Sequence, residues 1–296
     1  VNLPYMSFQG GDVSAGGDFT GGVCSTPAGI NTNVNAAGLG AGVEFAALAI
    51  GNISGFASAR GHGSANSLMF SNTTAPPGQF GGSHCIKDYY SSAPAAVTPG
   101  SSISVSGLTT GNVTYNGTFT LNGGTLGNDV TTGQGVRTGL YINGDLIIAG
   151  NIDYASASWP SLDDIPSLHI YVKGNIYIQE NVTSINAMLV AQPSATPNSG
   201  KIVTCASGTS PVPVAQLFAR CGGASGTRLT VRGALIANKV EFLRTSDSLR
   251  NASGDGGANA AELVDLSPEF LLVAPKSNSN VVPKDYQYFT TLPPVL

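Results

Sequence analysis

A glycine-interrupted pattern of alternating apolar residues recurs along this chain and restricts its fold more than any other feature. The stretch YINGDLIIAGNIDY runs from Tyr141 to Tyr154, and YVKGNIYIQENVTSI runs from Tyr171 to Ile185 with nearly the same pattern. Written as apolar-x-apolar-x-Gly-x-apolar, the pattern occurs a third time, after about twice the interval that separates the first two copies. The aligned positions are Leu140, Ile142, Gly144 and Leu146, then Ile170, Val172, Gly174 and Ile176, and then Leu229, Val231, Gly233 and Leu235.

This repeat predicts short β-strands that return at a fixed interval. Alternation with period two places the apolar residues on one face of a strand, and the glycine marks a bend or a close approach of the backbone. A chain that coils so that inward residues stack on equivalent residues is a β-solenoid, or parallel β-helix, here with units of roughly 30 residues. An antiparallel β-sandwich is the alternative, but it does not require a repeat of this length. Weaker copies of the pattern are Ile103, Val105 and Gly107, and Tyr115, Gly117, Phe119 and Leu121.

The N-terminal third contains an apolar stretch of a different kind. Residues 36–59 are apolar but include Glu44, Asn52 and five glycines, which makes them too polar to span a membrane. Residues 43–59 are apolar almost all round, which predicts a helix buried inside the protein. We therefore expect a mainly all-β chain with two regions. Residues 1–95 form a β-rich region containing this helix, packed on or continuous with the solenoid, and residues 96–296 form the solenoid and an extended C-terminal tail.

The four cysteines, Cys24, Cys85, Cys205 and Cys221, have no spacing typical of a metal or haem site. We expect two disulfides, Cys24 with Cys85 and Cys205 with Cys221, because the second pair would close one excursion rich in glycine, serine and proline. Four cysteines allow three connectivities, and four buried free thiols are the alternative.

Composition favours an exported protein without a nucleic-acid partner. Charged residues make up 10% of the 296 residues, and 13 basic against 17 acidic side chains give a net charge of −4. Soluble proteins usually contain about 25% charged residues, and nucleic-acid binding needs a basic surface. A polar but weakly charged chain that begins with Val1 is typical of a secreted protein with a processed N-terminus, so we expect an extracellular or cell-surface location.

The sharpest hint of catalysis is Asp163 next to Asp164, with His62 in a Gly-His-Gly sequence. Polygalacturonase-like β-helix enzymes have sites of this kind, in which paired carboxylates protonate a glycosidic oxygen and activate water. In this chain the histidine precedes the acids, and the acids lie in the proline-containing loop SWPSLDDIPS, where a turn or cap is the simpler interpretation. His62, His84 and His169 are too scattered for a metal site, and His169 is expected to face outward from a strand. We therefore predict no enzyme, no cofactor and no metal.

Several segments resemble a known group of proteins. GALIANKVEFLRTSDSLRN, AAELVDLSPEFLL and the terminal TTLPPVL, with GGDVSAGGDF and HCIKDYY upstream, are similar to secreted β-rich surface proteins of ultrasmall, host-attached bacteria of the Patescibacteria type. This resemblance implies a surface location and a β-rich fold and supplies no active site. A looser, architectural likeness to bactofilins, which are polymer-forming β-solenoids, implies end-to-end stacking.

Both ends of the chain are apolar and predict contacts with protein. They either cover the flanks of the solenoid or lie in a neighbouring copy, where an added strand would extend a sheet and an interface that does not close would generate a filament. The candidate interface residues are Val1, Leu3, Tyr5, Phe8, Tyr288, Phe289, Leu292, Val295 and Leu296.

The first functional hypothesis is therefore an extracellular structural subunit of a surface filament or appendage, whose partners are copies of itself. The second is an adhesin that binds glycan or a host surface through a face carrying Tyr141, Tyr171 and Tyr177. The third is a polysaccharide-degrading enzyme that uses Asp163 and Asp164.

Overall fold

A computed structural model describes most of the chain beyond residue 87 and seven short strands before it. The described residues are 6–9, 13–15, 30–31, 42–43, 46–49, 53–54, 68–70, 88–95, 97–156, 158–196, 199–222, 228–244, 261–267 and 269–273. The protein is rich in strands, and its described strands pair in parallel except for one short antiparallel pair, β18 with β19. The antiparallel sandwich is therefore wrong.

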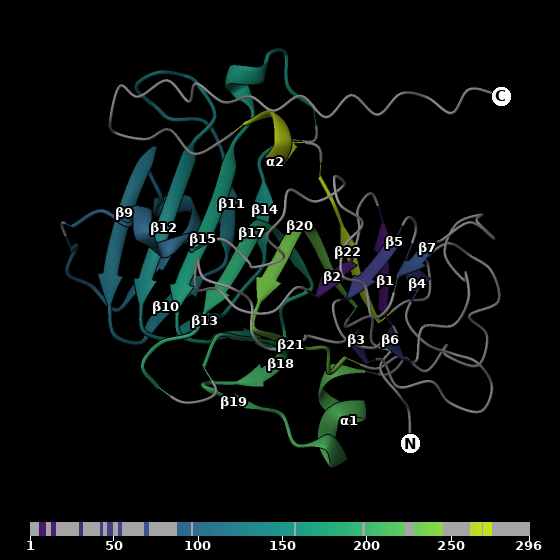
Figure 1. Ribbon diagram of the computed structural model, residues 1–296. Coiled ribbons are helices and arrows are strands. Elements are labelled where there is room, and N and C mark those ends of the chain that lie inside the picture. The colour runs from purple at the N-terminus through teal and green to yellow at the C-terminus, as the bar shows by residue number, and fades with distance from the viewer. Residues whose placement is uncertain are drawn as a thin grey trace, which may run out of the picture.

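Two large sheets organise the molecule (Figure 1). The ten-stranded sheet has the order β4-β1-β22-β20-β17-β15-β12-β9, and β14 pairs with both β17 and β11. Its strands are β1 (Met6–Gln9), β4 (Gly42–Val43), β9 (Gly111–Asn116), β11 (Gly124–Leu126), β12 (Arg137–Asn143), β14 (Ile152–Tyr154), β15 (Ser167–Lys173), β17 (Ser184–Gln192), β20 (Leu229–Ala237) and β22 (Glu262–Asp265).

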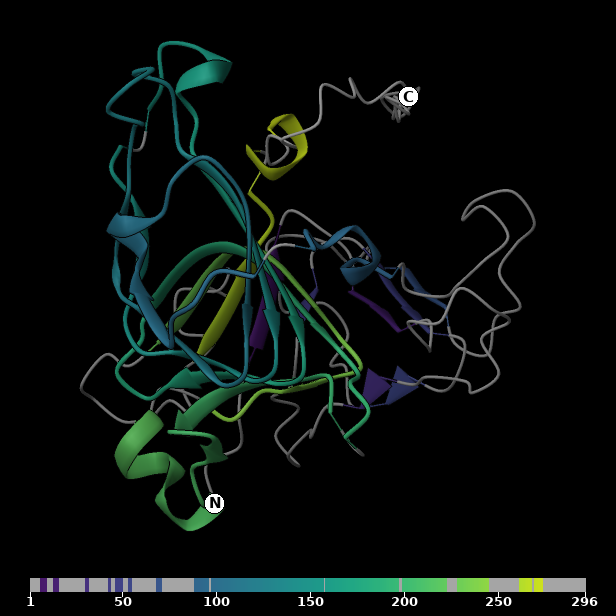
Figure 2. The ribbon, with the colours of Figure 1, turned by 90° about the vertical axis from the view of Figure 1, so that its left-hand side faces the viewer.

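The seven-stranded sheet has the order β19-β18-β16-β13-β10-β8, with β21 also paired to β18. The chain passes from one sheet to the other, for example from β12 to β13 and from β15 to β16, and Figure 2 shows these passages from the β9 end. The strands are β8 (Ser102–Ser104), β10 (Phe119–Asn122), β13 (Leu146–Ile148), β16 (Ile176–Gln179), β18 (Lys201–Ser207), β19 (Ser210–Pro211) and β21 (Lys239–Glu241).

Helical segments are short and lie between or after these strands. The α-helices are α1 (Leu217–Cys221) and α2 (Glu269–Leu272), and the 3-10 turns are η1 (Tyr90–Ser92), η2 (Val105–Gly107), η3 (Leu162–Asp164) and η4 (Val214–Gln216).

The register of the first two copies of the repeat is confirmed. Leu140 pairs with Ile170 and Leu146 with Ile176, so the same interval separates equivalent positions in both sheets. The alternating apolar residues of these strands are fully buried in one core between the sheets, because period two directs them all to the same side. The weaker copy around Phe119 also stacks in the predicted order, since Phe119 pairs with Leu146.

The glycine of the pattern is at the corner where the chain leaves one sheet for the other. Gly117 has φ +83° and Gly144 has φ +151°, conformations that favour glycine. A Cβ atom on Gly144 would collide with the backbone of Gly117, and one on Gly174 would collide with Gly144. Successive corners therefore approach too closely for any other residue.

The register predicted for the third copy is wrong. Leu189 pairs with both Ile170 and Leu235, so Leu235, and not Leu229, occupies the position equivalent to Ile170. Gly233 lies opposite Ala187 inside β20 and is not at a corner. The interval along the chain is much shorter from β15 to β17 than from β17 to β20, as these paired residues show. Alignment at a fixed period cannot follow such unequal intervals.

The predicted helix over residues 43–59 is also wrong. Strands β4, β5 (Ala46–Ala49) and β6 (Ile53–Ser54) occupy part of this stretch, and they pair in parallel with β1, β2 (Val13–Ala15) and β3 (Ile30–Asn31) in the same order. A further strand, β7 (Leu68–Phe70), pairs with β5. The many glycines of this stretch disfavour a helix, and pairing with the preceding segment favours short strands.

The N-terminal strands extend the large sheet beyond its C-terminal strand. β1 lies between β22 and β4, so the start of the chain stacks after β22 and not before β9. The spatial order of the strands therefore differs from their order in the sequence.

Candidate functional site

The predicted acidic pair is a turn that caps a short helix. Asp164 accepts hydrogen bonds from the backbone N and the Oγ of Ser161, which closes a capping box at η3. The side chain of Asp163 is 65% exposed, and one of its oxygens lies 3.7 Å from Arg137 Nη2. His62 lies outside the described residues. Both carboxylates have local structural partners, as the simpler interpretation of this loop predicts.

The aromatic face predicted for glycan binding is covered. Tyr141 and Tyr171 stack with their ring centroids 4.7 Å apart, yet they are only 4% and 8% exposed. Tyr89 stacks on Tyr171 at 5.8 Å, and Tyr90 meets Tyr141 edge to face at 5.8 Å. Of the three tyrosines proposed for this face, only Tyr177 is half-exposed.

The segment that covers them, residues 88–94, is called the strap. Gln192 of β17 donates a hydrogen bond to Asp88 Oδ1 (2.8 Å) at one end of the strap. Thr114 of β9 donates one to the carbonyl of Pro94 (3.1 Å) at the other end. The strap therefore crosses β17, β15, β12 and β9 on the outer face of the large sheet. The crossing carries the chain from the N-terminal strands, beside β22, to the β9 end.

His169 was expected to face outward from its strand. It does lie on the opposite side of the strand from the core residues Leu168 and Ile170, but it is buried there. It is 7% exposed, and its Nδ1 lies 3.1 Å from the Tyr171 hydroxyl. Burial lowers the pKa of His169 to about 4, so the ring is neutral at pH 7. His84 lies outside the described residues. Within the ranges that the structure describes, no group of three His, Cys, Asp or Glu side chains could hold a metal ion.

One candidate interface residue can be placed. Phe8 lies in β1, which is paired with β22 on one side and with β4 on the other. Its ring meets that of Phe242 edge to face, with centroids 5.7 Å apart. Residues 7 and 8 therefore have no free strand edge in this conformation. The other candidates, Val1, Leu3, Tyr5, Tyr288, Phe289, Leu292, Val295 and Leu296, lie outside the described residues.

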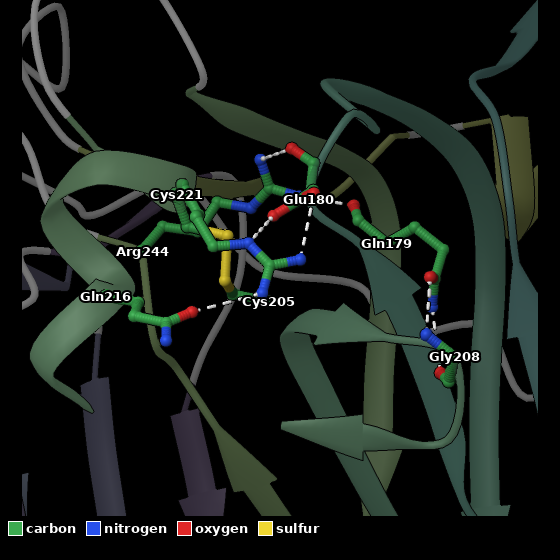
Figure 3. A network of polar contacts seen from close by, with 8 residues as sticks. Gln179, Glu180, Cys205, Gly208, Gln216, Cys221 and Arg244 are labelled. Atoms are coloured by element: carbon green, nitrogen blue, oxygen red, sulfur yellow. Dashed lines mark hydrogen bonds and ion pairs between the residues drawn. A yellow bond between two sulfur atoms is a disulfide. The ribbon is translucent and has the colours of Figure 1, made fainter. Parts of the chain in front are cut away.

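A buried polar cluster around Arg244 was missed by the sequence analysis (Figure 3). Arg244 is fully buried, and its guanidinium donates to the carbonyls of Thr204 (2.9 Å), Gln179 (3.0 Å) and Glu180 (3.3 Å). Burial lowers the pKa of Arg244 to about 10, against the opposing charges of Glu262 and Glu180, so it remains charged at neutral pH. The cation thus joins β16 and the turn after it to β18.

Glu262 of β22 belongs to the same cluster. Its Oε1 accepts hydrogen bonds from Thr204 Oγ1 and from the backbone N of Arg244 (3.1 Å), whereas Oε2 is buried without a hydrogen-bond partner. Burial raises the pKa of Glu262 to about 7, although the Thr204 hydroxyl and the charge of Arg244 favour the ionised form. This carboxyl therefore titrates near neutral pH.

A disulfide and an ion pair lie beside this cluster, as Figure 3 shows. Cys205 of β18 and Cys221 of α1 are bonded, with Cα atoms 6.2 Å apart, as the sequence analysis predicted. Arg220 binds the Glu180 carboxylate through two nitrogens, at 2.5 and 3.0 Å. Gln179 exchanges two hydrogen bonds with the backbone of Gly208, at 2.8 and 2.9 Å. Cys24 and Cys85 lie outside the described residues.

Most charged groups of this cluster are engaged within the protein. The guanidinium of Arg244 is directed at main-chain carbonyls, and Glu180 is occupied by Arg220. Sequence reasoning had no signal for Arg244, because its partners lie far away in the chain.

Comparison of the chain with protein family models, with curated proteins and with solved structures gave no match. The part of the chain that the structure describes contains no helix long and apolar enough to cross a membrane. Only the chain's own fold and its polar cluster therefore bear on function.

Proposed function

We propose that this protein is an extracellular structural protein, a β-solenoid subunit that assembles with copies of itself into a surface filament or appendage. The observation that carries the proposal is the parallel stacking of strands in one sheet from β9 to β4, over a core of aligned aliphatic side chains. Stacking of this kind produces a stiff body whose end strands offer unpaired backbone groups to another chain.

Two further features support a structural role. The fully buried Arg244 donates hydrogen bonds to main-chain carbonyls, Asp164 caps a turn, and Asp163 is an exposed ion-pair partner. The Cys205–Cys221 disulfide is compatible with an oxidising compartment, where such bonds persist.

Electron microscopy of native material tests the proposal. Negative staining of shed or sheared surface material, beside light scattering of the recombinant chain, is expected to show filaments with a regular axial repeat and a mass that grows with concentration. A chain that stays monomeric at every concentration, with no filaments in native material, would contradict self-assembly. Cysteine alkylation of native protein before and after reduction tests the compartment, because an exported chain should keep Cys205 and Cys221 protected until reduction.

A further inference from the structure

Among the described residues, one strand pair, the junction, joins the N-terminal strands to a strand from later in the chain. Of the described strands before residue 71, only β1 pairs with a strand from later in the chain, and that strand is β22. The strands β2, β3, β5, β6 and β7 pair among themselves, and β4 pairs with β1. The N-terminal strands therefore join the large sheet as one group, through β1.

This pairing joins segments that are far apart in the sequence. Met6 lies opposite Glu262 and Gln9 opposite Asp265, and Phe8 contacts Phe242. The N-terminal group is tethered on its C-terminal side by residues 71–87, between β7 and the strap. A segment of this length spans at most about 60 Å when fully extended. The length of this segment therefore does not by itself confine β1 to the β22 of its own copy.

The junction is also less extensive than others in the same sheet. Among the described residues, β1 and β22 are paired over four positions, as many as β20 and β22, whereas β17 and β20 are paired over eight. At its first position Glu262 holds a buried carboxylate oxygen without a hydrogen-bond partner. A buried polar atom without a partner costs free energy, so β22 carries an unfavourable group at the position opposite Met6.

We propose that β1 is exchanged between copies: in the assembled protein, β1 of one copy pairs with β22 of the next, in the register seen within one chain. This inference rests on the proposed self-assembly and names its interface. The contacts are the same within and between chains, which makes such an exchange a low-cost route to association. Each copy offers one β1 and one β22, so an exchange that does not close into a ring continues as a filament.

A mixing experiment with cysteine variants tests the exchange. One chain carries Ser7→Cys, and a second chain of different tag length carries Leu263→Cys, since these positions face each other across β1 and β22. The two chains are mixed, assembled, oxidised and run on a non-reducing gel beside the unsubstituted protein. The expected result is a disulfide-linked heterodimer, because each variant alone lacks the second added cysteine of the pair.

Two controls fix the meaning of this result. Thr120→Cys and Ile147→Cys, on separate chains, face each other across β10 and β13 inside the central stack, and they should give no heterodimer. A single chain with both Ser7→Cys and Leu263→Cys should cross-link within itself when oxidised as a monomer. Formation of this internal disulfide shows that the geometry permits the bond. The internally cross-linked chain, called the locked chain, should not assemble, because its β1 cannot leave its own β22.

The outcomes separate the exchange from the proposed function. Filaments without a heterodimer, or filaments that still grow from the locked chain, would overturn the exchange and leave assembly through another surface. A heterodimer confined to closed dimers would support the exchange and contradict the filament. Absence of both filaments and heterodimer would overturn both proposals.

Discussion

The central strands and the strands that follow them share one aliphatic core, but the later strands have additional polar and covalent links. Between β12 and β15, equivalent residues repeat at one constant interval, with aliphatic contacts in the core and the stacked Tyr141 and Tyr171 on the outer face. From β15 to β20 the interval first shortens and then lengthens, and there the chain adds the Cys205–Cys221 disulfide and the Arg244 cluster. The disulfide and the Arg244 cluster thus accompany the part of the stack in which the interval between paired strands is unequal.

Among the substitutions that test this comparison, replacement of Arg244 by methionine should lower the stability of the protein most. Loss of the guanidinium removes hydrogen bonds to three main-chain carbonyls and leaves Glu262 without its compensating charge. We expect the free energy of unfolding to fall by about 3–5 kcal/mol, as when one partner of a buried charge network is removed. Chemical denaturation measures this fall. The matched control is Arg232→Met at an exposed position of β20, where we expect a change within ~0.5 kcal/mol. Equal losses in the two variants would contradict the role given to Arg244.

Substitution of Glu262 by glutamine should change the pH dependence of stability. Burial raises the pKa of Glu262 from its ordinary value of 4.5 to about 7, so the folded state binds a proton more tightly than the unfolded state. Its contribution to stability is present below pH 4.5 and is lost as pH rises through 7. We therefore expect the stability of Glu262→Gln relative to the original chain to rise between pH 4.5 and 7, by up to a few kcal/mol.

The difference between the two chains is the quantity to measure, because His169 acts in the opposite direction. Burial lowers the pKa of His169 to about 4, so its contribution is present above pH 6.5 and is lost as pH falls through 4. Both chains contain His169, and subtraction removes its effect. A difference that is flat from pH 4.5 to 7 would show that Glu262 does not titrate in this range.

Shortening one side chain of the central stack should have the smallest effect. Ile170→Val removes one methylene group from a fully buried position, and we expect a loss of about 1 kcal/mol. Ile147→Val serves as the control. Ile147 is half-buried and points away from the core, unlike its neighbours Leu146 and Ile148, so its substitution should lower the free energy of unfolding less. Thermal or chemical unfolding of the two variants compares them. A loss of several kcal/mol at Ile170 would mean that the central strands are as sensitive to a single substitution as the Arg244 cluster.

Part of the fold followed from local pattern. The strands around Tyr141 and Tyr171, their register, and the close approach of the corner glycines were predicted, because alternation and interval are properties of neighbouring residues. The Cys205–Cys221 pair was predicted because it closes a short loop. The helix over residues 43–59 was mispredicted, since short apolar stretches do not distinguish a buried helix from strands.

The sequence by itself determined that the central part of this chain forms short strands that return at a constant interval, with glycine at the corners and aliphatic residues inside. Only the tertiary structure decided which segments cover the outer face and which strands follow β22. The strap buries Tyr141 and Tyr171, β1 pairs with β22, and Arg244 reaches Gln179. The physical reason is distance along the chain: alternation constrains a strand and its immediate copy, whereas these contacts depend on where the chain returns after long, unequal excursions.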